Sequence, residues 1–179
     1  MKHSEDKLEV VSVRLVKEAP LFSQHKINTP RDAVNVVGDL LSEMDREVIC
    51  IVNLKNNGSV INCHFASIGS INGAMAEPRE LFKASILSNA ANMIMLHCHP
   101  SGELFPSKQD TILTDRLIKL SDLLGISLLD HIIVGGGNKT EYFSFKEKGI
   151  LPKPNNVYEH DYMDLDFDGW IAEDEEWER

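Results

Sequence analysis

The chain has 179 residues, of which 42% are hydrophobic and 26% are charged, proportions that are ordinary for a globular protein with its own core. No apolar run approaches the roughly 20 residues of a membrane-spanning helix, and the first ten residues lack the apolar centre of a secretory signal peptide. The three cysteines, Cys50, Cys63 and Cys98, are odd in number and far apart. This argues against a disulfide framework and predicts a reducing, cytoplasmic location.

The formal net charge of −10 is concentrated near one end of the sequence. Residues 155–179 contain ten acidic residues and one arginine, whereas the rest of the chain has 18 acidic and 17 basic residues and is nearly neutral. Because this part of the chain is nearly neutral, its charge gives no support for DNA as a partner. We expect the acidic tail to lie outside the core and to be dispensable for folding. Its aromatic residues suggest binding, and three interpretations stay open: an interaction segment, an intramolecular plug over the active site, or a solubilising end.

Apolar, β-branched or alternating runs predict the strands. They cover residues 8–17, 47–54, 59–67, 91–99 and 126–137, and residues 141–151 predict a short strand followed by a helical turn. Asn57-Gly58 predicts a tight hairpin turn between the second and third of these strands, and residues 135–137 predict a glycine turn.

Helices are predicted over residues 28–45, 77–90 and 106–125, where apolar residues recur at helical spacing. Thr29 is expected to cap the first helix, and Gly125 to end the third. The buried side of the second helix is predicted to consist of Leu81, Ile86 and Leu87. Strands and helices that alternate in this way predict an α/β or α+β fold with helices on a mixed sheet.

The stretch "HCHPSGELFPSKQD", residues 97–110, places two histidines at the end of a predicted strand. Side chains two residues apart in a strand point to the same face, so His97 and His99 aim at one point and Cys98 at the opposite face. Taken alone, such a pair is equally typical of two surface histidines, or of one core histidine with a satisfied hydrogen bond. Cys98 is expected to belong to the core.

Ser107 and Asp110 extend the pattern to the following helix. Alone, Ser-x-x-Asp before an apolar helix is typical of a capping box. Together with the two histidines, and with a loop rich in proline and glycine between them, it predicts a zinc site. Two imidazoles and one carboxylate leave one tetrahedral position open, as in catalytic zinc sites, where the ion lowers the pKa of bound water to about 7.

The spacing His-x-His-x7-Ser-x2-Asp, filled by His97, His99, Ser107 and Asp110, resembles the JAMM signature of JAB1/MPN metalloproteases. The surrounding "HPSG", "PS..D" and "LLDH" resemble the bacterial RadC-like branch of that superfamily over about residues 29–151. The resemblance implies a JAB1/MPN-like fold with a cytidine-deaminase-like architecture. It divides the chain into an N-terminal strand and loop extension (1–28), a RadC-like JAB/MPN domain (29–151) and an acidic tail (152–179).

The resemblance also implies the roles of the site residues. In the superfamily the two histidines and the aspartate bind one zinc ion, the serine supports the tetrahedral intermediate, and an upstream glutamate acts on the water. That glutamate matches Glu47, directly before a predicted strand. Glu80 is the competing residue, and we expect it to face solvent or to cap its helix.

Two features depart from the RadC-like branch. Cys98 stands where that branch usually has asparagine, at a position that is not a ligand. Longer relatives carry a preceding helix-hairpin-helix-like domain, for which the first 28 residues are too short.

The function implied is that of a zinc-dependent hydrolase, a peptidase or isopeptidase in which metal-activated water attacks an amide carbonyl. Its expected partner is a peptide or protein substrate of unidentified sequence, and no membrane is expected. Two alternatives stay open: a DNA-associated accessory or repair factor, which rests on the family name alone, and a non-catalytic MPN-type scaffold. The oligomeric state is not predicted.

Overall fold

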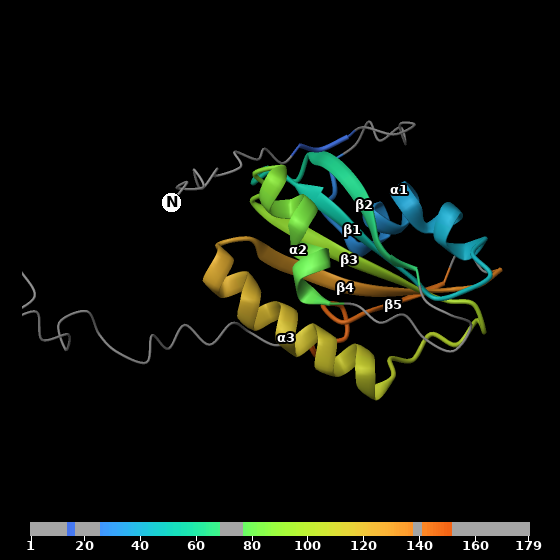
Figure 1. Ribbon diagram of the computed structural model, residues 1–179. Helices are drawn as coiled ribbons and strands as arrows, with labels where there is room; N and C mark the ends of the chain where they lie inside the picture. Colours follow the sequence, from blue (N-terminus) through green and yellow to red (C-terminus); the bar gives the residue numbers. More distant parts are fainter. Residues whose placement is uncertain (1–13, 17–25, 69–76, 138–140, 152–179) are drawn as a thin grey trace, which may run out of the picture.

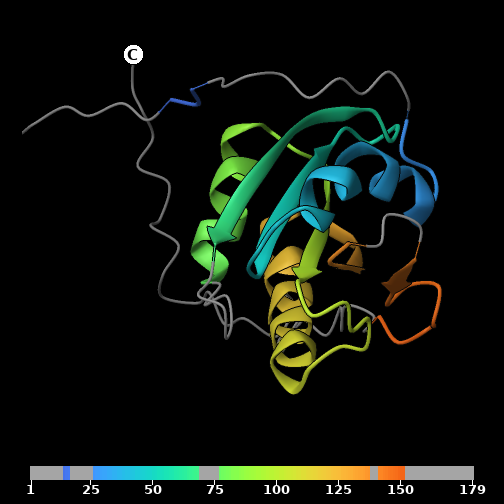
Figure 2. The same cartoon turned by 90° about the vertical axis from the view of Figure 1, so that its right-hand side faces the viewer.

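The computed structural model describes residues 14–16, 26–68, 77–137 and 141–151. Within these residues, a five-stranded sheet lies between one helix on one face and two helices on the other (Figures 1 and 2). The helices are α1 (Pro30–Ser42), α2 (Pro78–Leu87) and α3 (Lys108–Leu124). The strands are β1 (Val48–Leu54), β2 (Val60–Ile68), β3 (Asn92–His99), β4 (Ser127–Gly135) and β5 (Tyr142–Ser144).

The sheet is mixed, and its strand order is β2-β1-β3-β4-β5. β3 pairs in parallel with β4, and the other neighbouring strands are antiparallel. β3 is buried on both faces: Ile94 and Leu96 pack with α1, whereas Met93 and Met95 pack with α2 and α3. The predicted fold class, helices flanking one mixed sheet, is therefore confirmed.

Helix α1 begins as its sequence predicts. The Thr29 side chain accepts a hydrogen bond from the Asp32 backbone N–H, and the Asp32 carboxylate accepts one from the Thr29 N–H. Pro30 occupies the first helical position, where no hydrogen bond from its nitrogen is needed. The buried face of the helix, which includes Val37 and Leu41, covers the sheet from the side opposite α2 and α3.

Helix α2 buries a different face from the one predicted. Leu81 is buried as expected, but Ile86 is 50% exposed and Leu87 is 36% exposed. The place next to the sheet is taken by Ser85, whose hydroxyl donates to the Asn53 side chain of β1 at 2.6 Å. Ser85 shares the buried face with Pro78, Leu81, Phe82 and Ala84, and Ile86 and Leu87 therefore lie toward solvent.

Two sequence predictions fall mainly on residues that the structure does not describe. Of the strand expected over residues 8–17, only residues 14–16 are described, and they form no strand. The acidic tail lies outside the described residues altogether. Among the residues that are described, no helix is long and apolar enough to cross a membrane.

The glycine turn after β4 packs directly against the loop that follows β3. A Cβ atom on Gly136 would lie 2.6 Å from the Pro100 carbonyl oxygen, and one on Gly135 would lie 3.0 Å from the carbonyl oxygen of Gly102. The Gly136 N–H also donates to the His99 carbonyl at 2.8 Å. The absence of side chains therefore lets the two loops approach and holds the chain just after His99.

We predict that Gly136→Ala destabilises the protein by about 1–3 kcal/mol, because the added methyl group collides with backbone that cannot move freely. Gly137→Asn is the matched control: a Cβ there meets no atom within 4 Å, and asparagine tolerates its φ of +72°. Urea unfolding curves of both variants test this, and equal stability of Gly136→Ala and the wild type would refute the close packing.

Candidate metal centre

The end of β3 presents two buried histidines on the face that α3 covers. His97 and His99 are 4% and 8% exposed, and they lie on the same side of the strand as Met93 and Met95. Cys98 points to the other face and is fully buried in the core against α1, as predicted. Burial raises the pKa of the Cys98 thiol to about 11. Because it lies on the face opposite His97 and His99, it is not placed to share a metal ion with them.

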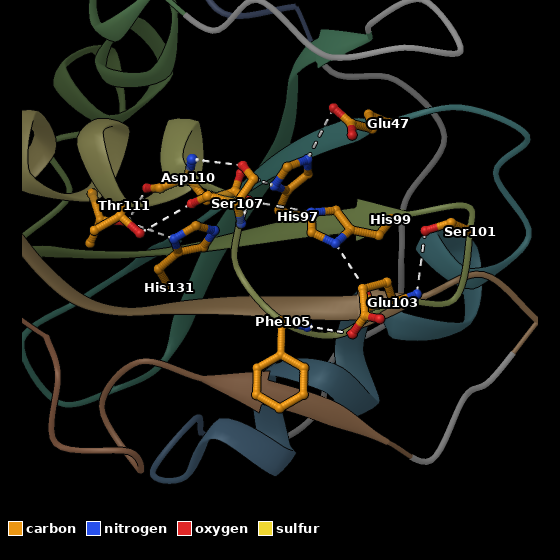
Figure 3. A network of polar contacts seen from close by, with 11 residues as sticks. Glu47, His97, His99, Ser101, Glu103, Phe105, Ser107, Asp110, Thr111 and His131 are labelled. Carbon is orange, nitrogen blue, oxygen red and sulfur yellow. Dashed lines mark hydrogen bonds and ion pairs between the residues drawn. The ribbon is translucent and has the colours of Figure 1, made fainter.

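Helix α3 brings Asp110 to the histidines through its capping box (Figure 3). The Ser107 side chain accepts from the Asp110 N–H at 3.1 Å, and Asp110 Oδ2 accepts from the Ser107 N–H at 2.7 Å. The same carboxylate contacts both imidazoles: Oδ1 lies 3.0 Å from His97 Nδ1, and Oδ2 lies 3.5 Å from His99 Nε2. The cap therefore aims Asp110 at the site, so the capping and ligand interpretations are compatible.

Glu47 reaches the same centre from β1. Val48 pairs with Cys98 in the antiparallel β1–β3 ladder, so the residue before Val48 lies at the edge of the sheet where β3 ends. Glu47 Oε2 is 3.7 Å from His97 Nε2, and its side chain is 26% exposed. Glu47 therefore touches both the buried centre and solvent.

The spacing of these atoms is that of ligands around a cation. Ligand atoms of Glu47, His97 and His99 all lie within 4.8 Å of one another, and these three residues can hold a metal ion. In a tetrahedral zinc site with bonds of about 2.1 Å, ligand atoms lie about 3.4 Å apart. The 3.5 Å contact between Asp110 Oδ2 and His99 Nε2 matches that separation. Glu47 and Asp110 approach opposite nitrogens of His97, Nε2 and Nδ1, of which one ion can bind only one. His97 Nε2 is buried without a hydrogen bond to any described residue, which a bound ion would explain.

The hydrogen bond to His99 leaves one of its nitrogens facing the centre. His99 Nδ1 lies 2.8 Å from the Glu103 carbonyl oxygen. Because a carbonyl only accepts, Nδ1 carries the proton when the ring is neutral. The lone pair then resides on Nε2, the nitrogen that faces Asp110. A backbone carbonyl that orients a ligating histidine in this way is common in metal sites.

The charges of the site favour an ionised carboxylate beside the imidazoles. Burial by itself would raise the pKa of Asp110, but contacts with His97, His99 and Ser107 outweigh it and hold the pKa far below its usual range. The contact with Asp110 in turn raises the pKa of His99. An anion fixed beside the two rings attracts either protons or a cation, and these two compete for the same nitrogens.

His131 and Thr114 support the site, and sequence reasoning gave them no role. The Thr114 hydroxyl donates to the Asp110 carbonyl at 2.7 Å and lies 2.7 Å from His131 Nδ1. The His131 ring stacks on Phe145 and lies nearly parallel to His97, with the histidine ring centroids 6.2 Å apart. Burial lowers the pKa of His131 to about 3, so the ring is a neutral spacer behind the ligands. Its only signal in the sequence was its place in "LLDH".

The two remaining predicted residues lie in different surroundings. Ser107 is exposed at the start of α3, next to Asp110. Glu80 lies on α2, where its half-exposed carboxylate pairs with Lys83. Among the predicted residues, the structure brings Glu47, His97, His99, Ser107 and Asp110 together and leaves Glu80 outside.

Comparisons with known proteins identify the family to which the chain belongs. A model of the RadC-like JAB domain family matches residues 27–150. The chain belongs to this family. UPF0758 proteins of Clostridium acetobutylicum and Desulforamulus reducens are 40% and 41% identical to it over 130 and 138 residues, or 73% and 77% of the chain. A UPF0758 protein of Methanosarcina mazei is 35% identical over 128 residues, or 72% of the chain.

The RadC-like JAB domain makes up part of these relatives. The matched region covers 56%, 60% and 55% of the three proteins, in the order given. The chain thus spans little more than half the length of the curated relatives it matches. Their common part includes the strand, loop and helix that build the centre described above.

We predict that the purified RadC-like JAB domain binds one zinc ion per chain and that the double variant His97→Ala, His99→Ala loses it. The reason is that these two imidazoles supply the nitrogen ligands of the centre. Elemental analysis by mass spectrometry after gel filtration measures the molar ratio of zinc to protein. The double variant must remain folded by circular dichroism, and full retention of zinc in it would refute the site.

We also predict that metal affinity falls as the pH is lowered, because a protonated imidazole cannot ligate. Contact with Asp110 raises the pKa of His99, so proton competition should begin above about pH 6.5, the ordinary value for histidine. Competition with a coloured chelator measures the zinc affinity at each pH between about 8 and about 5. Histidine is the ligand that titrates in this range. An affinity that stays constant over that range would contradict the histidine ligands.

Proposed function

We propose that this RadC-like JAB domain is a zinc-dependent hydrolase that cleaves amide bonds in peptides or proteins, as a peptidase or isopeptidase. The observation that supports it is the convergence of two buried imidazoles and two carboxylates, one buried and one partly exposed, at the end of β3. Nitrogen and oxygen donors of this kind suit zinc. When bound, zinc would polarise the substrate carbonyl and make water available as a nucleophile near neutral pH.

In this proposal His97, His99 and Asp110 are the ligands. Asp110 contacts both imidazoles and stays ionised, because its neighbours hold its pKa far below the usual range. Its position is fixed by the hydrogen bond from the Ser107 N–H.

Glu47 acts as the general base and then as the general acid. Its carboxylate approaches His97 to 3.7 Å yet is 26% exposed, so it can reach a water molecule in the site and exchange protons with solvent. It would take a proton from the attacking water and deliver it to the leaving amine. Proton transfer by a positioned group typically contributes about 10²–10⁴-fold to the rate.

Ser107 supplies a hydrogen-bond donor for the tetrahedral intermediate. Its hydroxyl oxygen accepts from the Asp110 N–H at 3.1 Å, and this contact leaves the hydroxyl hydrogen available. The side chain is at the exposed start of α3, beside the ligands. It can therefore donate to an oxygen that becomes negative during attack on an amide carbonyl.

A second ligand set is compatible with the distances and is separated by experiment. In it, Glu47 binds the ion together with the two histidines, and Asp110 only orients His97 through Nδ1. Asp110→Asn should lose the metal if Asp110 is a ligand, whereas Glu47→Gln should lose it if Glu47 is. Zinc content of the two folded variants decides between these sets.

We predict that Glu47→Gln retains zinc but loses about 10²–10⁴-fold in hydrolysis, because glutamine keeps the size of the side chain but cannot take up a proton. Glu80→Gln is the matched control, since Glu80 lies on α2 and pairs with Lys83. A panel of peptides and isopeptide-linked conjugates would first provide a cleaved substrate. Equal activity of Glu47→Gln and the wild type would exclude Glu47 as the base.

Failure of the whole panel with zinc-loaded, folded protein would favour a non-catalytic scaffold.

Substitution of Ser107 provides a second test of the proposed catalysis. Ser107→Thr keeps a hydroxyl and a helix cap, whereas Ser107→Ala removes both and costs about 1 kcal/mol of stability. A loss of activity that Thr restores would support the donor role.

A further inference from the structure

A surface groove of about 380 Å³ is lined by residues of α2 and α3. These two helices lie on the face of the sheet opposite α1 (Figure 1). Its apolar lining includes Phe82 and Ile86 of α2 and Leu120 and Leu124 of α3. Ile86 and Leu124 are 50% and 43% exposed, although side chains of this size usually lie inside. Ile86 is also one of the two residues that were expected on the buried side of α2 and lie toward solvent instead.

The groove is distinct from the metal centre. Asp110 is in the first turn of α3, and Leu124 is its last residue. The groove-lining residues of α3 lie between six and fourteen positions beyond Asp110, or about 9–21 Å along the helix at 1.5 Å per residue. None of the residues that line the groove belongs to the candidate metal centre, and this inference does not rest on the proposed function.

We propose that residues 162–171 of the chain's own acidic tail occupy this groove. This segment reads "YMDLDFDGWI", in which Met163, Leu165 and Phe167 alternate with aspartates. In extended conformation, alternate side chains point to opposite sides, so one edge of such a segment is apolar and the other acidic. An apolar groove with basic residues at its rim matches both edges.

The charges of the groove and the tail are complementary. Arg79 and Arg116 line the groove together with one acidic residue, Glu77. Arg116 forms no ion pair with any of the residues that the structure describes. The tail has ten acidic residues and one arginine between residues 155 and 179, whereas the rest of the chain is nearly neutral. The tail thus carries the opposite charge to the groove rim.

The connection to the body brings the tail near the groove. Leu151, the last described residue, packs on the apolar cluster that contains Phe82 and Leu117. Residues 152–161, if extended, span about 33 Å, whereas the 17 residues of α3 extend over about 25 Å. The segment can therefore reach the groove from its attachment point without help from a second molecule.

The two tryptophans of the chain, Trp170 and Trp177, both lie in the tail, so tryptophan fluorescence of the full chain reports on the tail alone. The variant Trp177→Phe leaves Trp170 as the single reporter. We expect its emission at shorter wavelength, and its quenching by acrylamide weaker, than in the same protein unfolded in urea. Equal emission and equal quenching in the two states would overturn the proposal.

Groove variants in the same background locate the binding site. Leu124→Glu and Arg116→Glu should each shift the emission to longer wavelength and increase quenching. The matched controls on α3 are Leu123→Glu and Lys119→Glu, because these side chains are exposed but do not line the groove. Both controls should behave like the parent, and circular dichroism must show that all four variants are folded.

Two further outcomes would overturn the proposal. Shielding of Trp170 that survives both groove substitutions would place the tail elsewhere on the body. Shielding that disappears on dilution would assign the segment to a second copy of the chain, whereas intramolecular docking is independent of protein concentration. Added salt should partly release the tail segment from the groove, because screening weakens the contact between its aspartates and the arginines of the groove.

Discussion

The register between β1 and β3 is the constraint on which the candidate centre depends. It pairs Val48 with Cys98, which leaves Glu47 at the strand end where His97 and His99 face α3. Side chains alternate along a strand, so a slip of one residue would turn the histidines toward α1 and the Cys98 thiol toward α3. Both faces of β3 are packed against helices, and the cost of burying the wrong set of side chains keeps the register unique.

Asp110 links the start of a helix to the chemistry of the centre. The carboxylate satisfies a backbone N–H that the helix itself leaves without a partner, and at the same time it faces two imidazoles. A helix N-terminus also favours a negative charge. One side chain therefore serves local stability and the electrostatics of the site, and its replacement affects both.

Much of this arrangement could be predicted from local sequence, because periodicity and caps are local properties. The start of α1 after Thr29, the end of β3 at His99, the opposite orientations of His97 and Cys98, and the Ser107–Asp110 cap follow from local sequence. The buried side of α2 could not be predicted, since the Ser85–Asn53 contact joins residues 32 positions apart. The same holds for His131 behind His97 and for the approach of Gly136 to Pro100, which arise only when distant segments meet.

The anchoring of the candidate ligands has a consequence for how the proposed centre would take up an ion. The Ser107 N–H holds Asp110, and the Glu103 carbonyl holds His99, so these side chains are positioned by bonds that involve no metal. A folded chain can then be loaded or exchanged without refolding. Occupancy would follow supply and the general order of affinities among divalent ions, in which copper exceeds zinc and zinc exceeds iron and manganese. The ion found in a preparation would accordingly reflect the metals available to the cells that produced it.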